Sequence, residues 1–303
     1  MNREIAERFC NILGKDRVLL KEPMKSHTTF RIGGPADYYL LPQMQEQVAE
    51  LVQVCQREQL PYFILGNGSN LLVSDKGFRG AVIQIFKNMS EITAEGICLR
   101  AQAGALLSLV SHRAMELGLT GFEFAGGIPG TMGGAAVMNA GAYGGELKDV
   151  LEEVTVVTPE GELRVIPASE LAMGYRTSLV KQKGYIVVEA LIRLQPGDKD
   201  AIRERMKELS RLRISKQPLE YPSAGSTFKR PEGYFAGKLI MDAGLRGYRV
   251  GDAQVSEKHC GFVINTGQAS AEEVRQLMED VIERVQSQFG VTLEPEVRFL
   301  GEF

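Results

Sequence analysis

The sequence predicts a protein of mixed helices and strands that is divided into two or three domains. Its 303 residues are too many for one core of average size. In the N-terminal part, apolar residues at helical spacing alternate with short apolar runs that are typical of buried strands. Residues 151–194, in contrast, are rich in strand signals and poor in helix signals, so this portion differs from the beginning of the chain.

The N-terminal part is expected to form an amphipathic helix up to about Leu20 and then a β-α-β unit. Two glycines and a proline break the strand entry at residues 28–37. The helical spacing of apolar residues from Met44 to Cys55 predicts the helix of the unit. Residues 61–65 predict the buried strand that follows it.

The middle part predicts several strands around one helix. That helix carries apolar residues at core spacing between Leu106 and Leu117. A Pro-Gly-Asp break at residues 196–198 marks a domain boundary. The expected strands are residues 81–86, 97–101, 151–157, 163–166 and 185–194.

The C-terminal part predicts two helices, a loop and a closing strand. Residues 199–213 are expected to form a charged helix, and residues 221–231 an irregular loop bracketed by prolines. One apolar face from Val274 to Val285 predicts a helix that packs on the core. Residues 291–299 are expected to close the chain as a strand.

Composition and charge exclude several classes of protein. The formal net charge is -3 and there is no lysine or arginine block, so we expect neither a nucleic-acid nor a membrane-surface partner. No apolar run approaches the roughly 18 residues of a membrane helix, and the start of the chain lacks the apolar core of a signal peptide. We therefore expect a cytoplasmic protein without an obligate protein partner.

Cysteines and histidines give no support to a metal site. The four cysteines occur singly, and the three histidines are far apart in the chain. Neither a zinc site nor a disulfide framework fits this spacing, so we expect no metal and buried thiols.

The strongest chemical signal is a glycine cluster at residues 126–134, followed by a second glycine-rich run at residues 139–146. Main-chain amides that no side chain covers can form a concavity for a phosphate or a diphosphate. The spacing matches neither the G-x-G-x-x-G fingerprint of a Rossmann domain nor the Walker loop. The alternative is that the glycines only form turns.

Two further segments join this pattern. The predicted strand at residues 61–65 runs into Gly66-Asn67-Gly68-Ser69-Asn70, whose small residues would let a ligand approach the main chain closely. Farther along the chain, Arg176 is flanked by hydroxyl side chains just before a predicted strand. Taken alone, Arg176 is better interpreted as a solvated surface arginine.

Six segments, taken in order, resemble the UDP-N-acetylenolpyruvoylglucosamine reductase family. The resemblance covers nearly the whole chain, from about residue 25 to residue 301. The segments that carry it are Thr29-Phe30-Arg31-Ile32-Gly33-Gly34, residues 66–70, residues 127–134, Gly174-Tyr175-Arg176, Gly225-Ser226-Thr227-Phe228-Lys229 and Glu294-Pro295-Glu296-Val297-Arg298.

The resemblance implies an α+β fold in three parts. It predicts an FAD-binding module of the vanillyl-alcohol oxidase and p-cresol methylhydroxylase type, made of two subdomains, and a C-terminal α+β substrate domain. The corresponding ranges are residues 1–90 with the N-terminal helix, residues 91–196, and residues 197–303. The FAD is expected to be bound non-covalently, with NADPH as co-substrate.

The resemblance also implies a reaction of peptidoglycan precursor synthesis. NADPH reduces the flavin, and hydride then passes to the enolpyruvyl carbon remote from the carboxylate, which yields UDP-N-acetylmuramate. Arg176 is expected to stabilise the charge that develops on the carboxylate side. Ser226 is expected to donate the proton to the adjacent carbon, and Glu296 matches the third catalytic residue of the family.

Binding residues follow from the same motifs. The residues expected to contact FAD are Arg31, Gly66, Asn67, Gly68, Ser69, Asn70, Gly127, Gly130, Thr131, Gly133, Gly134, Asn139, Ala140 and Gly141. The residues expected to contact the sugar nucleotide are Tyr175, Arg213, Lys216, Lys229 and Arg298.

The chain departs from the family pattern at two places. Only residues 179–184 separate Thr177-Ser178 from the next predicted strand, which indicates the shorter subtype without an inserted tyrosine loop. Arg230 stands where many relatives carry asparagine, which bears on contact with the diphosphate. Two other classes compete: a flavin oxidase of the same fold, with flavin attached covalently, and a non-enzymatic nucleotide-binding module.

Overall fold

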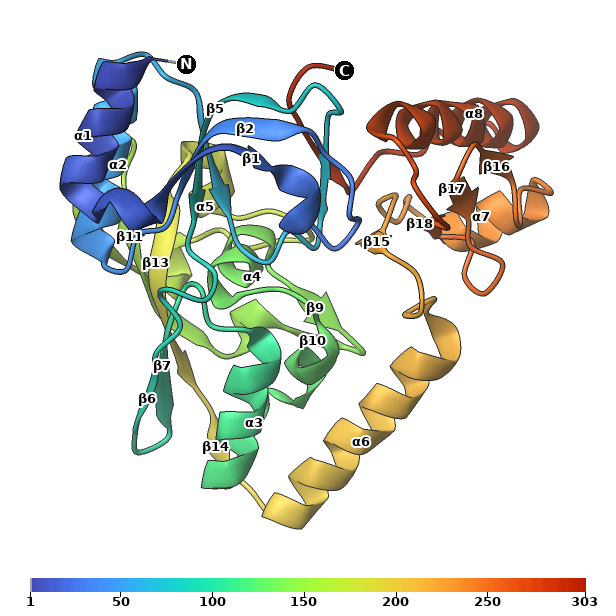
Figure 1. Ribbon diagram of the computed structural model, residues 1–303. Coiled ribbons are helices and arrows are strands. Elements are labelled where there is room, and N and C mark those ends of the chain that lie inside the picture. The colour runs from blue at the N-terminus through green and yellow to red at the C-terminus, as the bar shows by residue number, and fades with distance from the viewer. Residues whose placement is uncertain (1) are drawn as a thin grey trace. The chain divides into compact units, whose positions relative to one another are not determined.

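The computed structural model describes residues 2–303, which form two compact units (Figure 1). The first unit comprises the chain up to Leu20 together with Tyr38–Asn67 and Gly80–Arg213. The second comprises Lys21–Asp37, Gly68–Arg79 and Ile214–Phe303. Each unit is therefore assembled from segments that are far apart in the sequence.

Helices occur in both units. The α-helices are α1 Arg3–Leu13, α2 Gln45–Arg57, α3 Leu107–Leu117, α4 Met132–Met138, α5 Leu179–Lys183, α6 Lys199–Lys216, α7 Ala236–Asp242 and α8 Ala271–Phe289. The short 3-10 helices are η1 Lys15–Arg17, η2 Met24–Ser26, η3 Glu123–Gly127, η4 Leu147–Asp149 and η5 Ala168–Glu170.

The strands are mostly short. Those before residue 110 are β1 Val18–Pro23, β2 Pro35–Leu40, β3 Tyr62–Leu65, β4 Leu71–Val73, β5 Phe78–Gln84, β6 Ile92–Glu95 and β7 Cys98–Gln102. Those from residue 119 to residue 196 are β8 Leu119–Thr120, β9 Gly141–Ala142, β10 Gly145–Glu146, β11 Leu151–Val157, β12 Leu163–Pro167, β13 Ile186–Arg193 and β14 Gln195–Pro196. The last are β15 Ser223–Ser226, β16 Arg249–Val250, β17 Ala253–Val255, β18 Phe262–Asn265 and β19 Arg298–Leu300.

The first unit contains an antiparallel five-stranded sheet with the order β12-β11-β13-β7-β6. A four-stranded sheet has the order β1-β2-β5-β3, in which β3 runs parallel to β5. The second unit has an antiparallel sheet with the order β15-β18-β17-β16, and a parallel pair of β4 and β19. Mixed sheets and segregated helices confirm the predicted α+β class.

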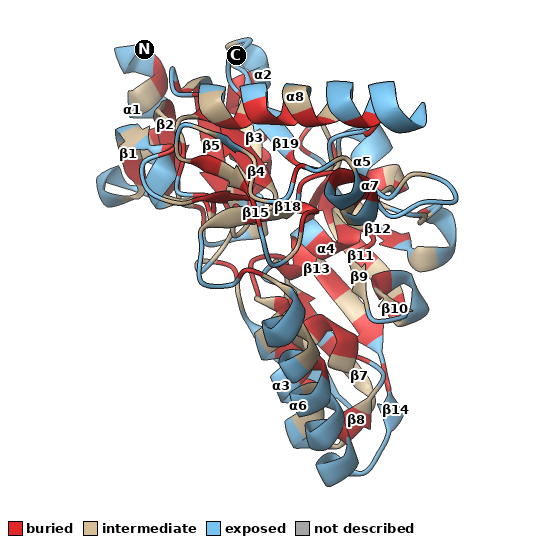
Figure 2. Ribbon diagram, turned by 90° about the vertical axis from the view of Figure 1, so that its right-hand side faces the viewer, coloured by how far each residue is buried: buried red, intermediate tan, exposed pale blue. Residues whose placement is uncertain are grey.

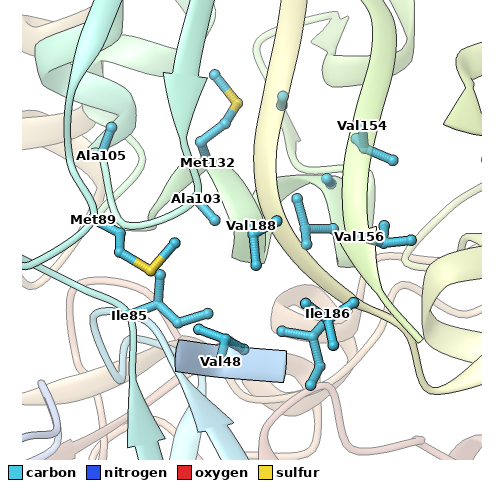
Figure 3. Packing of buried hydrophobic residues seen from close by; sticks show 14 of the residues in the cluster. Val48, Ile85, Met89, Ala103, Ala105, Met132, Val154, Val156, Ile186 and Val188 are labelled. Atoms are coloured by element: carbon cyan, nitrogen blue, oxygen red, sulfur yellow. The ribbon is translucent and has the colours of Figure 1, made fainter. Parts of the chain in front are cut away.

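The core of the first unit forms where α4 packs on β13 and β7 (Figure 3). Met132 of α4, Val154 and Val156 of β11 and Val188 of β13 lie in this cluster. The amide of Gly133 donates to the carbonyl of Ala103 at 2.9 Å. A Cβ atom at Gly133 would lie 2.8 Å from the Cβ of Ala103, so the glycine permits this close packing.

The core of the second unit forms under α8. Ser270 and Glu273 form a capping box at its N-terminus, where the Asp75 carboxylate also accepts hydrogen bonds from the amides of Ala271 and Glu272. Figure 2 shows one face of α8 buried and the other exposed, as its apolar spacing predicts, whereas α6 is mostly exposed. The buried residues of α8 are Ala271, Val274, Leu277, Met278, Val281 and Val285.

Some predicted elements have other bounds in the structure. The first helix ends at Leu13 because Gly14 adopts φ 84°, and the chain then enters β1 rather than continuing as a helix to Leu20. The predicted loop at residues 221–231 contains β15. The predicted closing strand at residues 291–299 is limited to β19, because residues 291–297 are irregular.

Other predictions hold. The charged helix is present as α6, three residues longer than predicted at its C-terminal end. The central strands are present as β11, β12 and β13. The prediction of buried thiols is confirmed for Cys55 and Cys260 and is wrong for Cys10 and Cys98, which are half-buried. No helix within residues 2–303 combines the length and apolar character that crossing a membrane requires.

The two units are defined by contacts within the chain. The three predicted domains, residues 1–90, 91–196 and 197–303, are defined instead by the ligand that each is expected to bind. The three-domain division therefore remains a prediction.

Candidate active site

Arg176 lies at the tip of a tight turn in the first unit. The amide of Gly174 donates to the carbonyl of Thr177 at 3.0 Å, and the amide of Thr177 donates back at 3.3 Å. Arg176 adopts φ 56°, a left-handed conformation that is costly for a residue with a side chain. Its guanidinium carbon lies 5.0 Å from the centre of the Tyr175 ring. The turn thus places two predicted site residues side by side.

The side chain of Asn139 holds this turn through a hydrogen bond to Gly174. Asn139 is buried at the C-terminal end of α4 with φ 44°, which asparagine tolerates better than most residues. Its Nδ2 donates to the carbonyl of Gly174 at 3.2 Å and to Oε2 of Glu146 at 3.0 Å. Its Oδ1 accepts from the amide of Lys148 at 3.0 Å. Asn139 therefore joins the glycine-rich run to the Arg176 turn.

Glu146, which the sequence interpretation did not select, lies beside the predicted site residue Asn139. The ammonium of Lys148 lies 2.8 Å from Oε2 of Glu146 and is the main cause that holds the pKa of this carboxyl below its ordinary value. The Asn139 amide and the positive charge of Arg176 lower the pKa further. The signal available in the sequence was its place at the end of the second glycine run.

The start of the segment at residues 66–70 meets the glycine cluster at residues 126–134 within the first unit. Nδ2 of Asn67 donates to the carbonyl of Pro129 at 2.8 Å. A Cβ atom at Gly66 would lie 2.6 Å from Oγ1 of Thr131, so only glycine fits there. Among residues 2–303, no hydrogen bond engages the main-chain amides of Gly130 or Thr131. Main-chain amides without a partner in a glycine-rich loop are the kind of donor that suits the diphosphate of FAD.

Not every glycine of the first cluster serves a ligand. The amides of Met132 and Gly133 are already bonded to the carbonyls of Ala105 and Ala103, which leaves them unavailable. Gly134 is exposed. The predicted contacts at Ala140 and Gly141 lie on the segment that leads from Asn139 into β9. Packing within the protein thus accounts for part of the cluster.

Arg213, near the end of α6, lies beside Gly127. A Cβ atom at Gly127 would be 3.2 Å from the Cδ atom of Arg213. Burial lowers the pKa of the Arg213 guanidinium, an effect that Tyr143 opposes. The group still carries its positive charge at neutral pH. A partly desolvated cation beside the first glycine cluster suits a phosphate group.

Ser226 and Glu296 are brought together in the second unit. Ser226 is exposed at the end of β15 and is paired with Phe262 of β18. The next residue, Thr227, is buried, and its carbonyl accepts a hydrogen bond from the amide of Glu296 at 2.8 Å. The two predicted catalytic residues therefore lie on adjoining segments, although 70 positions separate them in the chain.

Asn70, at the end of the segment at residues 66–70, lies beside these segments. Nδ2 of Asn70 donates to the carbonyl of Glu296 at 3.1 Å, and the carbonyl of Asn70 accepts from the amide of Arg298 at 3.1 Å. A Cβ atom at Gly225 would lie 3.8 Å from the carbonyl oxygen of Ser69. Predicted FAD contacts and predicted catalytic residues are thus neighbours in this unit.

The remaining predicted residues also have defined places. Gly68 accepts a hydrogen bond from the amide of Thr29 at 3.2 Å, and Arg31 is exposed with φ 57°. The Lys229 ammonium lies 2.8 Å from Oε2 of Glu294 and lowers the pKa of that carboxyl. Lys216 and Arg298 are exposed at the ends of α6 and in β19.

The fold and the glycine loops define a class of protein, the FAD-dependent oxidoreductases with a module of the vanillyl-alcohol oxidase type. The family model described as "FAD binding domain" matches residues 36–166, which include the glycine-rich segments at residues 66–70, 126–134 and 139–146. An alkyldihydroxyacetonephosphate synthase structure shares this fold at 16% identity and a TM-score of 0.51 over 65% of the chain.

The chain belongs to the UDP-N-acetylenolpyruvoylglucosamine reductase family. The model of the C-terminal domain of that family matches residues 217–300. The reductase of Agathobacter rectalis is 57% identical, with all of both chains covered. That of Lachnoclostridium phytofermentans is 52% identical, covering 100% of this chain and 99% of the relative. The crystal structure of the Thermus caldophilus reductase is 38% identical, with a TM-score of 0.80 over 94% of this chain and 99% of the other.

Proposed function

We propose that Arg176, Ser226 and Glu296 are the residues with which this flavoenzyme reduces the enolpyruvyl group of its UDP-sugar substrate to give UDP-N-acetylmuramate. The reaction, with FAD as cofactor and NADPH as reductant, follows from membership of the family. The observation that supports the residue roles is the hydrogen bond between Thr227 and Glu296, because it holds Ser226 and Glu296 on adjoining segments.

Bound FAD supplies the hydride chemistry between NADPH and the substrate. Hydride addition at the carbon remote from the carboxylate moves an electron pair toward the carboxylate, so negative charge develops there. The guanidinium of Arg176 stabilises that charge as a planar, bidentate cation. The hydrogen bonds between Gly174 and Thr177 hold the backbone of Arg176 at the tip of the turn, which reduces the reorganisation needed when the charge appears.

Ser226 completes the reaction by donating its hydroxyl proton to the carbon next to the carboxylate. A hydroxyl is a weak acid, so the transfer requires close positioning and a charge field that stabilises the resulting alkoxide. The exposed end of β15 presents the hydroxyl to a ligand, while buried Thr227 fixes the backbone behind it. Glu296 is assigned to a hydrogen bond with the substrate acid.

The predicted binding residues are divided between FAD and the sugar nucleotide. Gly66, Asn67, Gly130 and Thr131 are assigned to the FAD diphosphate, because their loops meet and two amides there are available as donors. The remaining residues predicted to contact FAD keep that role in the proposal. Tyr175, Arg213, Lys216, Lys229 and Arg298 are assigned to the sugar nucleotide. We also propose that the enzyme is cytoplasmic and has no obligate protein partner. Its net charge of -3 and lack of basic blocks support the absence of a nucleic-acid partner.

The test separates the two half-reactions under anaerobic conditions. Ser226→Ala should still be bleached by NADPH, but its reduced form should not regain flavin absorbance when the UDP-sugar is added. Ser223→Ala, on the same strand, is the matched control and should behave like the wild type. Full recovery of absorbance in Ser226→Ala at the wild-type rate would exclude Ser226 as the proton donor.

A second measurement addresses the rival oxidase. Acid precipitation should release all of the flavin into the supernatant, because non-covalent binding predicts a colourless pellet. Flavin that stays with the precipitated chain would favour the oxidase. A protein that binds FAD but shows neither half-reaction would favour a nucleotide-binding module.

A further inference from the structure

His259 lies in the turn between β17 and β18, and its ring is part of the hydrogen bonding of that turn. Nδ1 of His259 accepts from the amide of Gly261 at 3.1 Å, and the carbonyl of His259 accepts from the amide of Phe262 at 3.0 Å. Oγ of buried Ser256 accepts from the amide of His259 at 3.3 Å. The side chain and the backbone of His259 therefore both shape the turn.

The same turn is bonded directly to the segment that carries Ser226. The carbonyl of Gly261 accepts a hydrogen bond from the amide of Thr227 at 2.8 Å, and Oγ1 of Thr227 accepts from the amide of Val263 at 2.9 Å. Ser226 itself is paired with Phe262. One residue, Gly261, thus connects the imidazole of His259 through its amide to the residue that follows Ser226 through its carbonyl.

The imidazole is held on several sides. A Cβ atom at Gly261 would lie 2.9 Å from Cε1 of His259, and one at Gly237 of α7 would lie 3.3 Å from the same atom. The Phe262 ring packs edge-on, with ring centres 5.1 Å apart. Glycines at positions 237 and 261 give the ring the space it occupies, and the packing leaves little freedom for it to turn away from the Gly261 amide.

We propose that His259, neutral and with Nδ1 as a hydrogen-bond acceptor, is a positioning residue that sets the placement of the Ser226 hydroxyl. This inference rests on the proposed role of Ser226. Loss of the acceptor would leave the Gly261 amide without its partner and let the turn shift. A displacement of about 1 Å at a reacting group can reduce the rate about 100-fold. The substrate half-reaction is the step that should suffer.

The protonation state of His259 gives the inference a pH dependence. Burial lowers the pKa of His259 from the ordinary value of 6.5. The titratable and charged groups on the surrounding segments are Arg246, Glu257, Lys258 and Cys260 of the turn region and Lys238 of α7. Lys258 donates to the carbonyl of Ile214, Lys238 pairs with Asp242, and burial raises the pKa of the Cys260 thiol. Burial therefore dominates the shift of His259.

The direction of the pH dependence follows from the role of Nδ1 as a hydrogen-bond acceptor. At neutral pH the ring is neutral and Nδ1 accepts the Gly261 amide. As the pH falls below 6.5 toward the lowered pKa of His259, a proton on Nδ1 turns the acceptor into a donor. The placement of Ser226 should therefore be lost on the acid side and kept on the neutral side.

Two variants of the holoenzyme test the inference. His259→Asn can present an acceptor oxygen near the position of Nδ1 and does not titrate, whereas His259→Leu is apolar. At pH 7.5, His259→Leu should reoxidise about 100-fold more slowly with the UDP-sugar than wild type, while flavin reduction by NADPH stays unchanged. His259→Asn should retain most of the reoxidation rate and should lack the acid-side decline that wild type shows.

A structural readout keeps the test valid if His259→Leu fails to fold. The chain has three histidines, so nitrogen-15 labelling of histidine gives few signals, and His259→Asn removes those of His259. The inference predicts a neutral ring protonated on Nε2 at pH 7.5. A ring protonated on Nδ1, or equal reoxidation rates for wild type and His259→Leu, would overturn it. These results are distinct from failure of the proposed function, which Ser226→Ala alone decides.

Discussion

Replacing Asn139 by alanine should weaken both the fold of the first unit and the reaction. The change removes three hydrogen bonds, to Gly174, Glu146 and Lys148, and leaves their groups without this partner. A buried group that loses its partner costs about 1–3 kcal/mol, and solvent can satisfy part of the loss at Glu146 and Lys148. Alanine at φ 44° adds about 1 kcal/mol of backbone strain. We expect about 2–4 kcal/mol of destabilisation in total.

Asn139→Gly is the matched control, because it loses the same hydrogen bonds without the strain of a left-handed Cβ. Thermal unfolding followed by flavin fluorescence should show wild type most stable, Asn139→Gly next and Asn139→Ala least stable. Both variants should lose kcat because the Arg176 turn is no longer held. A midpoint for Asn139→Ala within about 1 °C of wild type would refute the reasoning, since each kcal/mol shifts the midpoint of a chain of about 300 residues by about 1.5 °C.

Two further predictions concern residues near the same site. Glu146→Gln should lower the unfolding midpoint at neutral pH; since the folded-state pKa of Glu146 lies below its ordinary 4.5, the difference from wild type should shrink as the pH falls below 4.5. A constant difference across a pH series of melts would contradict this. Gly133→Ala should destabilise by about 1–3 kcal/mol, because its Cβ would meet Ala103 at 2.8 Å. Gly134→Ala, whose nearest contact is 3.6 Å away, should be near wild type in denaturant titrations, and equal losses in both would remove the packing argument.

Local patterns in the sequence predicted much of the fold. The apolar spacing of α3 and α8 and the turn residues around β11 and β12 are local signals, and the structure contains those elements. The six motifs in order predicted the family and its cofactor. The first helix was overextended because Gly14, which ends it, is a single residue in an otherwise helical pattern.

Connections between distant segments could not be predicted from local patterns. The hydrogen bonds from Asn139 to Gly174 and from Glu296 to Thr227 join residues 35 and 69 positions apart. Periodicity within a window of one helix or strand carries no information about such pairs. The resemblance supplied Arg176, Ser226 and Glu296 as a set, but the hydrogen bonds from Asn139 to Gly174 and from Glu296 to Thr227 emerged only from tertiary packing.

The division of labour among the glycines was also not evident from the sequence. A glycine that makes room for a ligand and one that makes room for a neighbouring strand look the same in a motif. Gly66 makes room for the side chain of Thr131, and Gly133 makes room for Ala103 in the core. Distinguishing them requires the positions of atoms that are remote in the chain.

The central claim is that this chain uses a non-covalently bound flavin to pass hydride from NADPH to an enolpyruvyl UDP-sugar. The most direct measurement is the flavin absorbance of the purified protein during anaerobic addition of NADPH and then of the sugar nucleotide. The account predicts a flavin band that NADPH bleaches and that one equivalent of the sugar nucleotide restores. A protein that binds no FAD, or a reduced flavin that the sugar nucleotide leaves bleached, would contradict it.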